Sequence, residues 1–344
     1  MHPFLRSPRY TSDHVWFMCF LITDWRMDLM RSDAMTQREM NEEQGTDVDI
    51  ARRLLMKRRG IGLGAGAAAL GIMGASGLIG SKQASATNQG AGPPDADIFN
   101  FALNLEYLEA EFYLYAATGR GLAASDRTGT GTQGTVTPGA LVPFKSQAIQ
   151  QYAQRIAVDE QAHVKFIRAV LGANAVAEPS IDVGIGPNSA FSKLAIAAGL
   201  IVPGQTFNPY ADDISFLLGA SIFEDVGVTA YAGAARFIGN PDFLEAAAGI
   251  LAVEAYHSGA IRTLLSNIGA GVAFGLIADL RRKLSGVQDE QPLLIPGNSY
   301  NFVPNDINGL AFRRTTSQVL NIVYGGGASS GFLFFPSKMN GNIS

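Results

Sequence analysis

Two pairs of residues in this chain combine a carboxylate and an imidazole at the spacing of one helical turn. Glu160 and His163 form the first pair, and Glu254 and His257 form the second. Residues three positions apart share a face of a helix, so each pair can present both side chains to one point. Carboxylate and imidazole groups are ligands that suit iron or manganese. The spacing therefore indicates one metal site with two halves.

Both pairs interrupt a stripe of apolar residues that would otherwise form a buried helix face. A lone Glu-x-x-His pair is most often an exposed pair on a helix surface. In these stripes, however, an unpaired buried carboxylate would cost on the order of several kcal/mol, so a compensating positive charge is required. The first stripe comprises Ile149, Tyr152, Ile156, Glu160, His163, Ile167 and Val170, and the second comprises Phe243, Ala247, Ile250, Glu254, His257, Ile261 and Leu264.

Composition narrows the class of protein. The chain has 344 residues, enough for one large or two ordinary domains. A net charge of −4 provides no basic surface, so we expect no nucleic-acid partner. With 47% hydrophobic and 16% charged residues, the chain suits a globular protein with large buried helices. Cys19 is the single cysteine, so no internal disulfide can form.

The segment 51–86 has the features of an export signal. Ala51-Arg52-Arg53-Leu54-Leu55-Met56-Lys57 resembles the twin-arginine motif, with Ala51 where Ser or Thr is usual. An uncharged stretch rich in Gly and Ala follows at 61–80, and Ala84-Ser85-Ala86 fits the small-x-small cleavage rule. A transmembrane anchor is the alternative, but the seven glycines of 61–80 argue against it. We therefore predict recognition by the twin-arginine translocation machinery, cleavage before Thr87, and a periplasmic or extracellular protein.

Residues 1–50 are interpreted as a non-native or disordered N-terminal extension. A signal peptide normally begins near the initiator methionine, and a start at Met40 would leave a normal short basic region before 51–86. His2 and His14 lie in this segment. The mature chain would then retain only the two histidines of the Glu-x-x-His pairs.

The periodicity of the mature chain predicts an all-α fold whose centre is a four-helix bundle over 95–270. A Gly- and Thr-rich loop separates the first two helices, and Pro143 is read as the first turn of the second. Four prolines make 173–210 a long crossover between helices 2 and 3, with a short helix near 191–198. Residues 271–344 are predicted to be an irregular C-terminal extension with short helices at 273–284 and 315–324. The four long helices are expected at 98–118, 143–172, 211–238 and 241–267.

The first and third helices complete the candidate ligand set. Glu106, with Glu109 beside it, lies on the first helix, and Glu224 lies on the third. One Glu from each of two helices and Glu-x-x-His from the other two is the pattern of dinuclear carboxylate sites in bundles. Four carboxylates neutralise two divalent cations, and six protein ligands leave coordination positions open for O₂, peroxide or water.

The motifs resemble the ferritin-like superfamily. The resemblance rests on Asn104-Leu105-Glu106-Tyr107-Leu108-Glu109-Ala110-Glu111-Phe112-Tyr113 and the two Glu-x-x-His pairs, and it covers about 98–335. Within the superfamily, the chain is most similar to exported ferritin-like proteins related to plant desiccation-related proteins. Asn308–Thr315, Gln318-Val319-Leu320 and Asn340-Gly341 carry the looser likeness of the tail. The resemblance implies a ferritin-like four-helix bundle.

The resemblance also implies roles for individual residues. Glu106 is the first-helix ligand, because Tyr113 follows it at the family's Glu-to-Tyr spacing, and Glu109 is an alternative or supporting residue. Tyr107, Tyr113 and Tyr231 are interpreted as core or hydrogen-bonding residues. The implied metal ligands are Glu106 and its counterpart Glu224, Glu160 and Glu254 as bridging carboxylates, and His163 and His257 as terminal ligands, one for each metal. Asp159 and Asp225 are acids that can orient the histidines, with a solvated Asp225 as the alternative.

The expected function is that of an exported protein with two metal ions that reacts with O₂ or peroxide. Iron is favoured over manganese, and ferroxidase- or peroxidase-type chemistry in stress protection is the first hypothesis. Dimanganese catalase chemistry is an alternative. Another is a non-enzymatic structural or desiccation-stress protein whose metals only stabilise the bundle. Storage of a mineral core is a weaker hypothesis, and we expect a homodimer or small oligomer rather than a cage.

Overall fold

The computed structural model describes residues 92–287, 291–295, 299–327 and 332–344. These residues all belong to one compact unit. The predicted extension at 1–50 and the predicted export signal at 51–86 lie outside the described residues.

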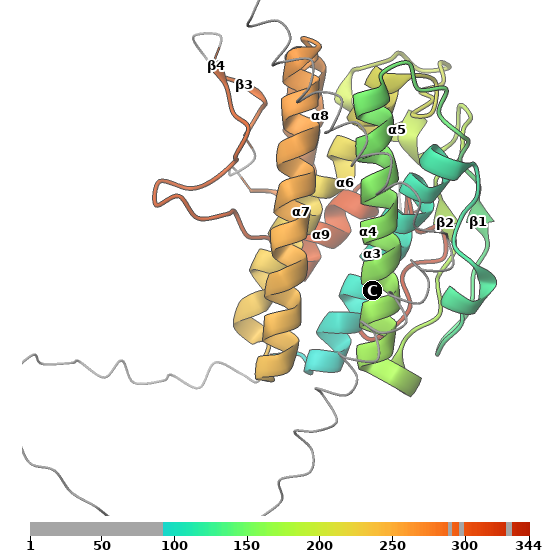
Figure 1. The fold of residues 1–344 in the computed structure, drawn as a ribbon, viewed down its shortest axis with the longest axis vertical. Helices are drawn as coiled ribbons and strands as arrows, with labels where there is room; N and C mark the ends of the chain where they lie inside the picture. The colour runs from blue at the N-terminus through green and yellow to red at the C-terminus, as the bar shows by residue number, and fades with distance from the viewer. Residues whose placement is uncertain (1–91, 288–290, 296–298, 328–331) are drawn as a thin grey trace, which may run out of the picture. The chain divides into compact units, whose positions relative to one another are not determined.

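Four long helices form the centre of the structure (Figure 1). Helix α3 packs along α4, and α6 packs along α7. The short turn between α6 and α7 makes this second pair antiparallel, as the Gly-Asn-Pro sequence predicts. The prediction of an all-α four-helix bundle is therefore confirmed. The helices are α3 (Asp95–Thr118), α4 (Gln147–Leu171), α6 (Asp213–Ala234) and α7 (Pro241–Asn267).

One helix start differs from the prediction. Helix α4 begins at Gln147 rather than near Pro143. Ser146 is its N-cap and accepts a hydrogen bond from the backbone N–H of Ile149 at 3.4 Å. The carboxylate of Asp213, at the start of α6, accepts hydrogen bonds from the backbone N–H groups of Lys145 and Ser146 at 3.1 and 3.0 Å. These contacts hold the preceding segment extended, so Pro143 lies before the helix.

Helices α3 and α6 are covered on every side. Each residue of 98–113 and of 216–231 is buried, whereas α4 and α7 bury only one face. The segment 213–237 is long and apolar enough to cross a bilayer, but 89% of its most apolar window is buried inside the protein, as expected for a core helix. One residue predicted to face the core is in fact exposed: Tyr152 at 44%.

The loop after α3 and the crossover after α4 hold each other against the bundle. Strand β1 (Val136–Thr137) pairs in parallel with β2 (Ile181–Asp182), a contact that the sequence pattern did not predict. The predicted short helix of the crossover is α5 (Ala190–Ala198). Single turns of 3₁₀-helix occur at η2 (Ala124–Asp126), η3 (Gly172–Asn174) and η4 (Ala235–Phe237).

The C-terminal extension completes the core of the bundle. Helices α8 (Gly271–Ser285) and α9 (Thr316–Val323) pack together and against α6, and β3 (Leu294–Ile295) pairs antiparallel with β4 (Ser299–Tyr300). Phe334 and Phe335 are fully buried. Near the end of the chain, Asn340 exchanges two hydrogen bonds with Asn104 of α3, at 2.8 and 3.1 Å.

A buried pair of carboxyl groups joins the crossover to α3. Glu111 of α3 and Glu178 of the crossover are 1% and 0% exposed. The Glu111 carboxylate accepts a hydrogen bond from the backbone N–H of Leu122 at 3.1 Å, and Arg127 donates to Glu178. Burial, together with the charge of Glu111, raises the pKa of Glu178 to about 8. Burial also raises the pKa of Glu111. The Glu178 carboxyl therefore stays protonated at neutral pH, beside the buried Glu111.

We predict that Glu178→Gln will flatten the pH dependence of stability between about pH 5 and pH 8. The folded-state pKa of Glu178 lies above its unfolded-state pKa. Its contribution to the free energy of unfolding is therefore fully present below the unfolded-state pKa. The contribution is lost as the pH rises through about 8. The slope attributable to one group is at most about 1.4 kcal/mol per pH unit. Urea unfolding across this range measures it, with the exposed Glu245→Gln as a control. A slope equal to that of the wild type would contradict the raised pKa of Glu178.

Candidate metal centre

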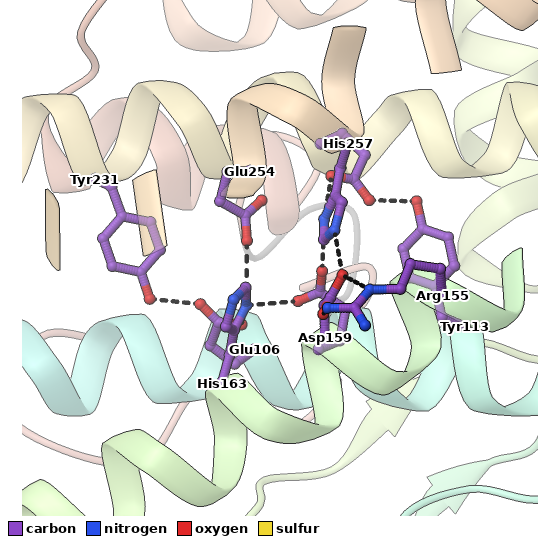
Figure 2. A network of polar contacts seen from close by, with 10 residues as sticks. Glu106, Tyr113, Arg155, Asp159, His163, Tyr231, Glu254 and His257 are labelled. Atoms are coloured by element: carbon purple, nitrogen blue, oxygen red, sulfur yellow. Dashed lines mark hydrogen bonds and ion pairs between the residues drawn. The ribbon is translucent and has the colours of Figure 1, made fainter. Parts of the chain in front are cut away.

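The structure brings all six predicted ligand residues to one place between the four long helices. Figure 2 labels Glu106, His163, Glu254 and His257 among them. Helices α3 and α6 each supply one glutamate, and α4 and α7 each supply a glutamate and a histidine. No residue of this set is more than 8% exposed. The set comprises Glu106, Glu160, His163, Glu224, Glu254 and His257.

The first group of ligands surrounds His163 and is called the His163 half. It contains Glu106, Glu160, His163 and Glu254, with one ligand atom of each within 4.8 Å of the others. The Nδ1 atom of His163 lies 3.1 Å from Glu106 Oε2, 3.3 Å from Glu160 Oε2 and 3.6 Å from Glu254 Oε1. The inward imidazole nitrogen is therefore Nδ1.

The second group surrounds His257 and is called the His257 half. It contains Glu160, Glu224 and His257 under the same 4.8 Å limit. His257 Nδ1 lies 3.0 Å from Glu160 Oε1 and 3.4 Å from Glu224 Oε2. Glu160 thus points one oxygen at each histidine, which is the position a bridging carboxylate requires. Glu254, expected as the other bridging residue, lies in the His163 half only.

Two tyrosines hold the terminal glutamates from opposite ends of the site (Figure 2). Tyr113 of α3 donates a hydrogen bond to Glu224 Oε1 of α6, and Tyr231 of α6 donates one to Glu106 Oε1 of α3. Burial raises the pKa of both hydroxyls well above the usual value, so both remain donors. Each tyrosine thereby occupies one oxygen of a glutamate and leaves the other directed at the centre. Tyr107 instead contacts Val176 and Arg168, outside the two groups.

Glu109 lies beside the site but belongs to neither group of ligands. Gly227 of α6 lies next to Glu109 and Glu254. A Cβ atom added at Gly227 would stand 2.4 Å from Glu254 Oε2 and 3.4 Å from Glu109 Oε1. Glycine at this position therefore makes room for the Glu254 carboxylate. Sequence reasoning missed Gly227, although the contrast of Glu224-x-x-Gly227 with Glu106-x-x-Glu109 is visible in the sequence.

The two adjacent aspartates have different environments. Asp159 Oδ2 lies 3.2 Å from His257 Nε2, the outer nitrogen of that imidazole, and Arg155 Nε donates to the same carboxylate at 2.9 Å. Asp225 neither orients a histidine nor faces solvent, contrary to both readings of the sequence. It is 6% exposed, and its carboxylate accepts hydrogen bonds from Ser258, Arg262 and Arg281.

The charges of the site are strongly coupled. Burial alone would lower the pKa of His163, but Glu106 and Glu160 raise it to about 12. Burial would likewise raise the pKa of Glu160, but the two histidines hold it well below its usual range. Burial raises the pKa of Glu106 to about 7 and raises the pKa of Glu254 well above its usual range. Without metal, therefore, protons on the imidazoles and carboxyls compensate the buried negative charge.

The donor atoms form groups that could hold metal ions. Within the described part of the chain, Glu160 Oε1, Glu224 Oε2 and His257 Nδ1 have only one another as ion-pair contacts. Both carboxylate oxygens of Glu254 are buried and have no hydrogen-bond partner among the described residues. Each such atom costs about 1–3 kcal/mol when it is left unsatisfied. Four carboxylates and two imidazoles, arranged as two groups that share Glu160, are a donor set that suits metal ions.

Comparisons with known proteins identify the family of the chain. The model of the ferritin-like domain family matches residues 94–267. The desiccation-related protein PCC13-62 of Craterostigma plantagineum is 34% identical over 248 residues, which cover 66% of this chain and 76% of the relative. The ferritin-like catalase Nec2 of Nesocodon mauritianus is 26% identical over 276 residues, which cover 74% of this chain and 86% of the relative. The chain therefore belongs to the ferritin-like family.

Proposed function

We propose that this protein binds two metal ions between its four long helices and uses them in an oxidoreductase reaction with peroxide or O₂. The observation that carries the proposal is the convergence of six buried ligand residues in two halves that share Glu160. Bound iron or manganese would supply the redox chemistry, and we favour iron.

The residues of the chain would hold and tune these ions. Glu106 and Glu224 would each offer a single oxygen, because Tyr231 and Tyr113 occupy the other. His163 and His257 would each offer Nδ1 after losing a proton. Metal binding must therefore release protons and weaken as the pH falls. The ligand residues are at most 8% exposed, so the substrate would be a small molecule.

Peroxide disproportionation is the first reaction to test, because one relative is named a ferritin-like catalase. In that reaction two H₂O₂ molecules yield two H₂O and one O₂, so no further reductant is needed. Chain loaded with Fe²⁺, and separately with Mn²⁺, should release O₂ from H₂O₂, and His257→Ala should not. Loaded chain that neither releases O₂ from peroxide nor oxidises added Fe²⁺ would contradict the proposed chemistry.

A structural role is the second candidate, because another relative is named a desiccation-related protein. In that case the metal-binding free energy would contribute only to folding. Metal removal would lower the melting temperature, while the loaded chain would show no turnover. The two assays together therefore separate the candidates.

We further propose that the protein is exported through the twin-arginine route. The support is the sequence of 51–86 alone, with the Arg52-Arg53 pair, an uncharged stretch and Ala84-Ser85-Ala86. Replacing Arg52 and Arg53 with Lys preserves the charge and should retain the precursor in the cytoplasm. Cell fractionation and immunoblotting measure this. Normal export of the double variant would point to another route.

A further inference from the structure

The site has an approximate two-fold relation that exchanges its halves. Glu106 and Tyr113 on α3 correspond to Glu224 and Tyr231 on α6, since each tyrosine lies seven residues after a glutamate and donates to the glutamate of the other helix. The Glu-x-x-His pair of α4 corresponds in the same way to that of α7. Residues at equivalent positions should therefore make equivalent contacts in the two halves of the site.

One pair of equivalent positions breaks this relation. Asp159 precedes Glu160 on α4, and Val253 precedes Glu254 on α7. The Asp159 carboxylate lies 3.2 Å from Nε2 of His257 on the opposite helix, and Arg155 holds that carboxylate in turn. Val253 stands at the position that corresponds to Asp159 by this relation, and its side chain has no group that accepts a hydrogen bond. Only one of the two histidines therefore has a carboxylate at its outer nitrogen from this position.

We propose that Asp159 is a positioning residue for the metal of the His257 half alone, so that the two metal positions are inequivalent. This inference rests on the proposed dinuclear site. A carboxylate that accepts a hydrogen bond from Nε2–H fixes the tautomer in which Nδ1 carries the lone pair, and it also makes that nitrogen a better donor to a metal. His257 Nδ1 already points at Glu160 and Glu224, the other ligands of its half.

The proposal predicts that Asp159→Ala lowers the affinity for one of two Mn²⁺ ions by roughly 10–100-fold and leaves the affinity for the other unchanged. Equilibrium dialysis of the folded chain against a series of Mn²⁺ concentrations should show two ions for the wild type. The variant should show a binding curve in two steps. At intermediate Mn²⁺ it should give the six-line electron paramagnetic resonance spectrum of an isolated ion. Asp159→Asn, whose side-chain oxygen can still accept the hydrogen bond, should give an intermediate loss.

Val253→Ala is the matched control, because it truncates the equivalent position of the other half without removing a polar group. It should retain two ions with wild-type affinities. An Asp159→Ala chain that binds both ions as tightly as the wild type, or loses both equally while still folded by circular dichroism, would overturn the proposal. If the variant does not fold, Asp159→Asn decides by the same criterion. A wild-type chain that binds no Mn²⁺ or Fe²⁺ would instead overturn the proposed function.

Discussion

Replacing Glu160 with Ala should abolish binding of both metal ions, because Glu160 is the residue that the two halves of the site share. Its two oxygens lie 3.3 Å from His163 Nδ1 and 3.0 Å from His257 Nδ1. No other residue in the described part of the chain contributes to both groups. The loss should exceed the roughly 10–100-fold that removal of an outer hydrogen-bond partner costs. Metal analysis after loading with Fe²⁺ or Mn²⁺ and desalting measures the effect.

Single replacements of the histidines provide the comparison. His163→Ala and His257→Ala should each lower the metal content, because each removes the nitrogen ligand of one half. Glu111→Gln is the control, since Glu111 is a buried glutamate of the same bundle that belongs to neither group. It should keep two ions per chain. Retention of both ions by Glu160→Ala would show that the halves do not depend on a shared carboxylate.

Replacing Asp225 with Ala should destabilise the protein by about 3–5 kcal/mol, the usual cost of breaking a buried ion pair. The Asp225 carboxylate lies 2.7 Å from both Arg262 Nη2 and Arg281 Nη2, and these three side chains are at most 6% exposed. Without the carboxylate, two buried guanidinium groups lose a shared partner. Urea unfolding of the metal-loaded protein measures the change.

A more exposed ion pair on α8 serves as the control for Asp225→Ala. Asp279 and Arg282 of α8 form an ion pair, but their side chains are 47% and 33% exposed. Asp279→Ala should therefore cost at most about 1 kcal/mol. Metal content should remain at two ions in both variants, because neither aspartate belongs to the ligand groups. A loss of less than about 1 kcal/mol for Asp225→Ala would mean that the buried ion pair adds little to stability.

The parts of the fold that the sequence predicts best are those fixed by local chemistry. Asn240 caps α7 and Pro241 opens it, so the start of that helix is readable from a Gly-Asn-Pro sequence. The start of α4 was misread because Pro143 suits a first turn, whereas the actual boundary depends on Asp213, 67 residues beyond Ser146. Contacts between distant segments leave no local signal of this kind.

The candidate site was readable because two of its helices are amphipathic. On α4 and α7 a glutamate and a histidine stand out in an otherwise apolar stripe. On α3 every residue from 98 to 113 is buried, so periodicity does not separate Glu106 from Glu109. The structure separates them by distance, since Glu106 Oε2 lies 3.1 Å from His163 Nδ1 and Glu109 joins neither group.

The contacts of the polar residues outside the ligand set depend on which segment of the chain packs against them. Asp159 and Asp225 are both acids next to a ligand glutamate, yet only Asp159 meets a histidine. Asp225 faces Arg262 and Arg281, and the second of these comes from the C-terminal extension, whose packing the sequence pattern does not determine. The Glu178 carboxyl was missed for the same reason, because its partner Arg127 lies in another loop.

The metal content of the protein purified from its own host tests the central claim most directly. Inductively coupled plasma mass spectrometry on chain that begins at Thr87 should find two metal ions per chain, iron in preference to manganese. A chain that folds, is offered Fe²⁺ and Mn²⁺, and still retains no metal would contradict the dinuclear centre. The buried glutamates and histidines would then be compensated by protons alone.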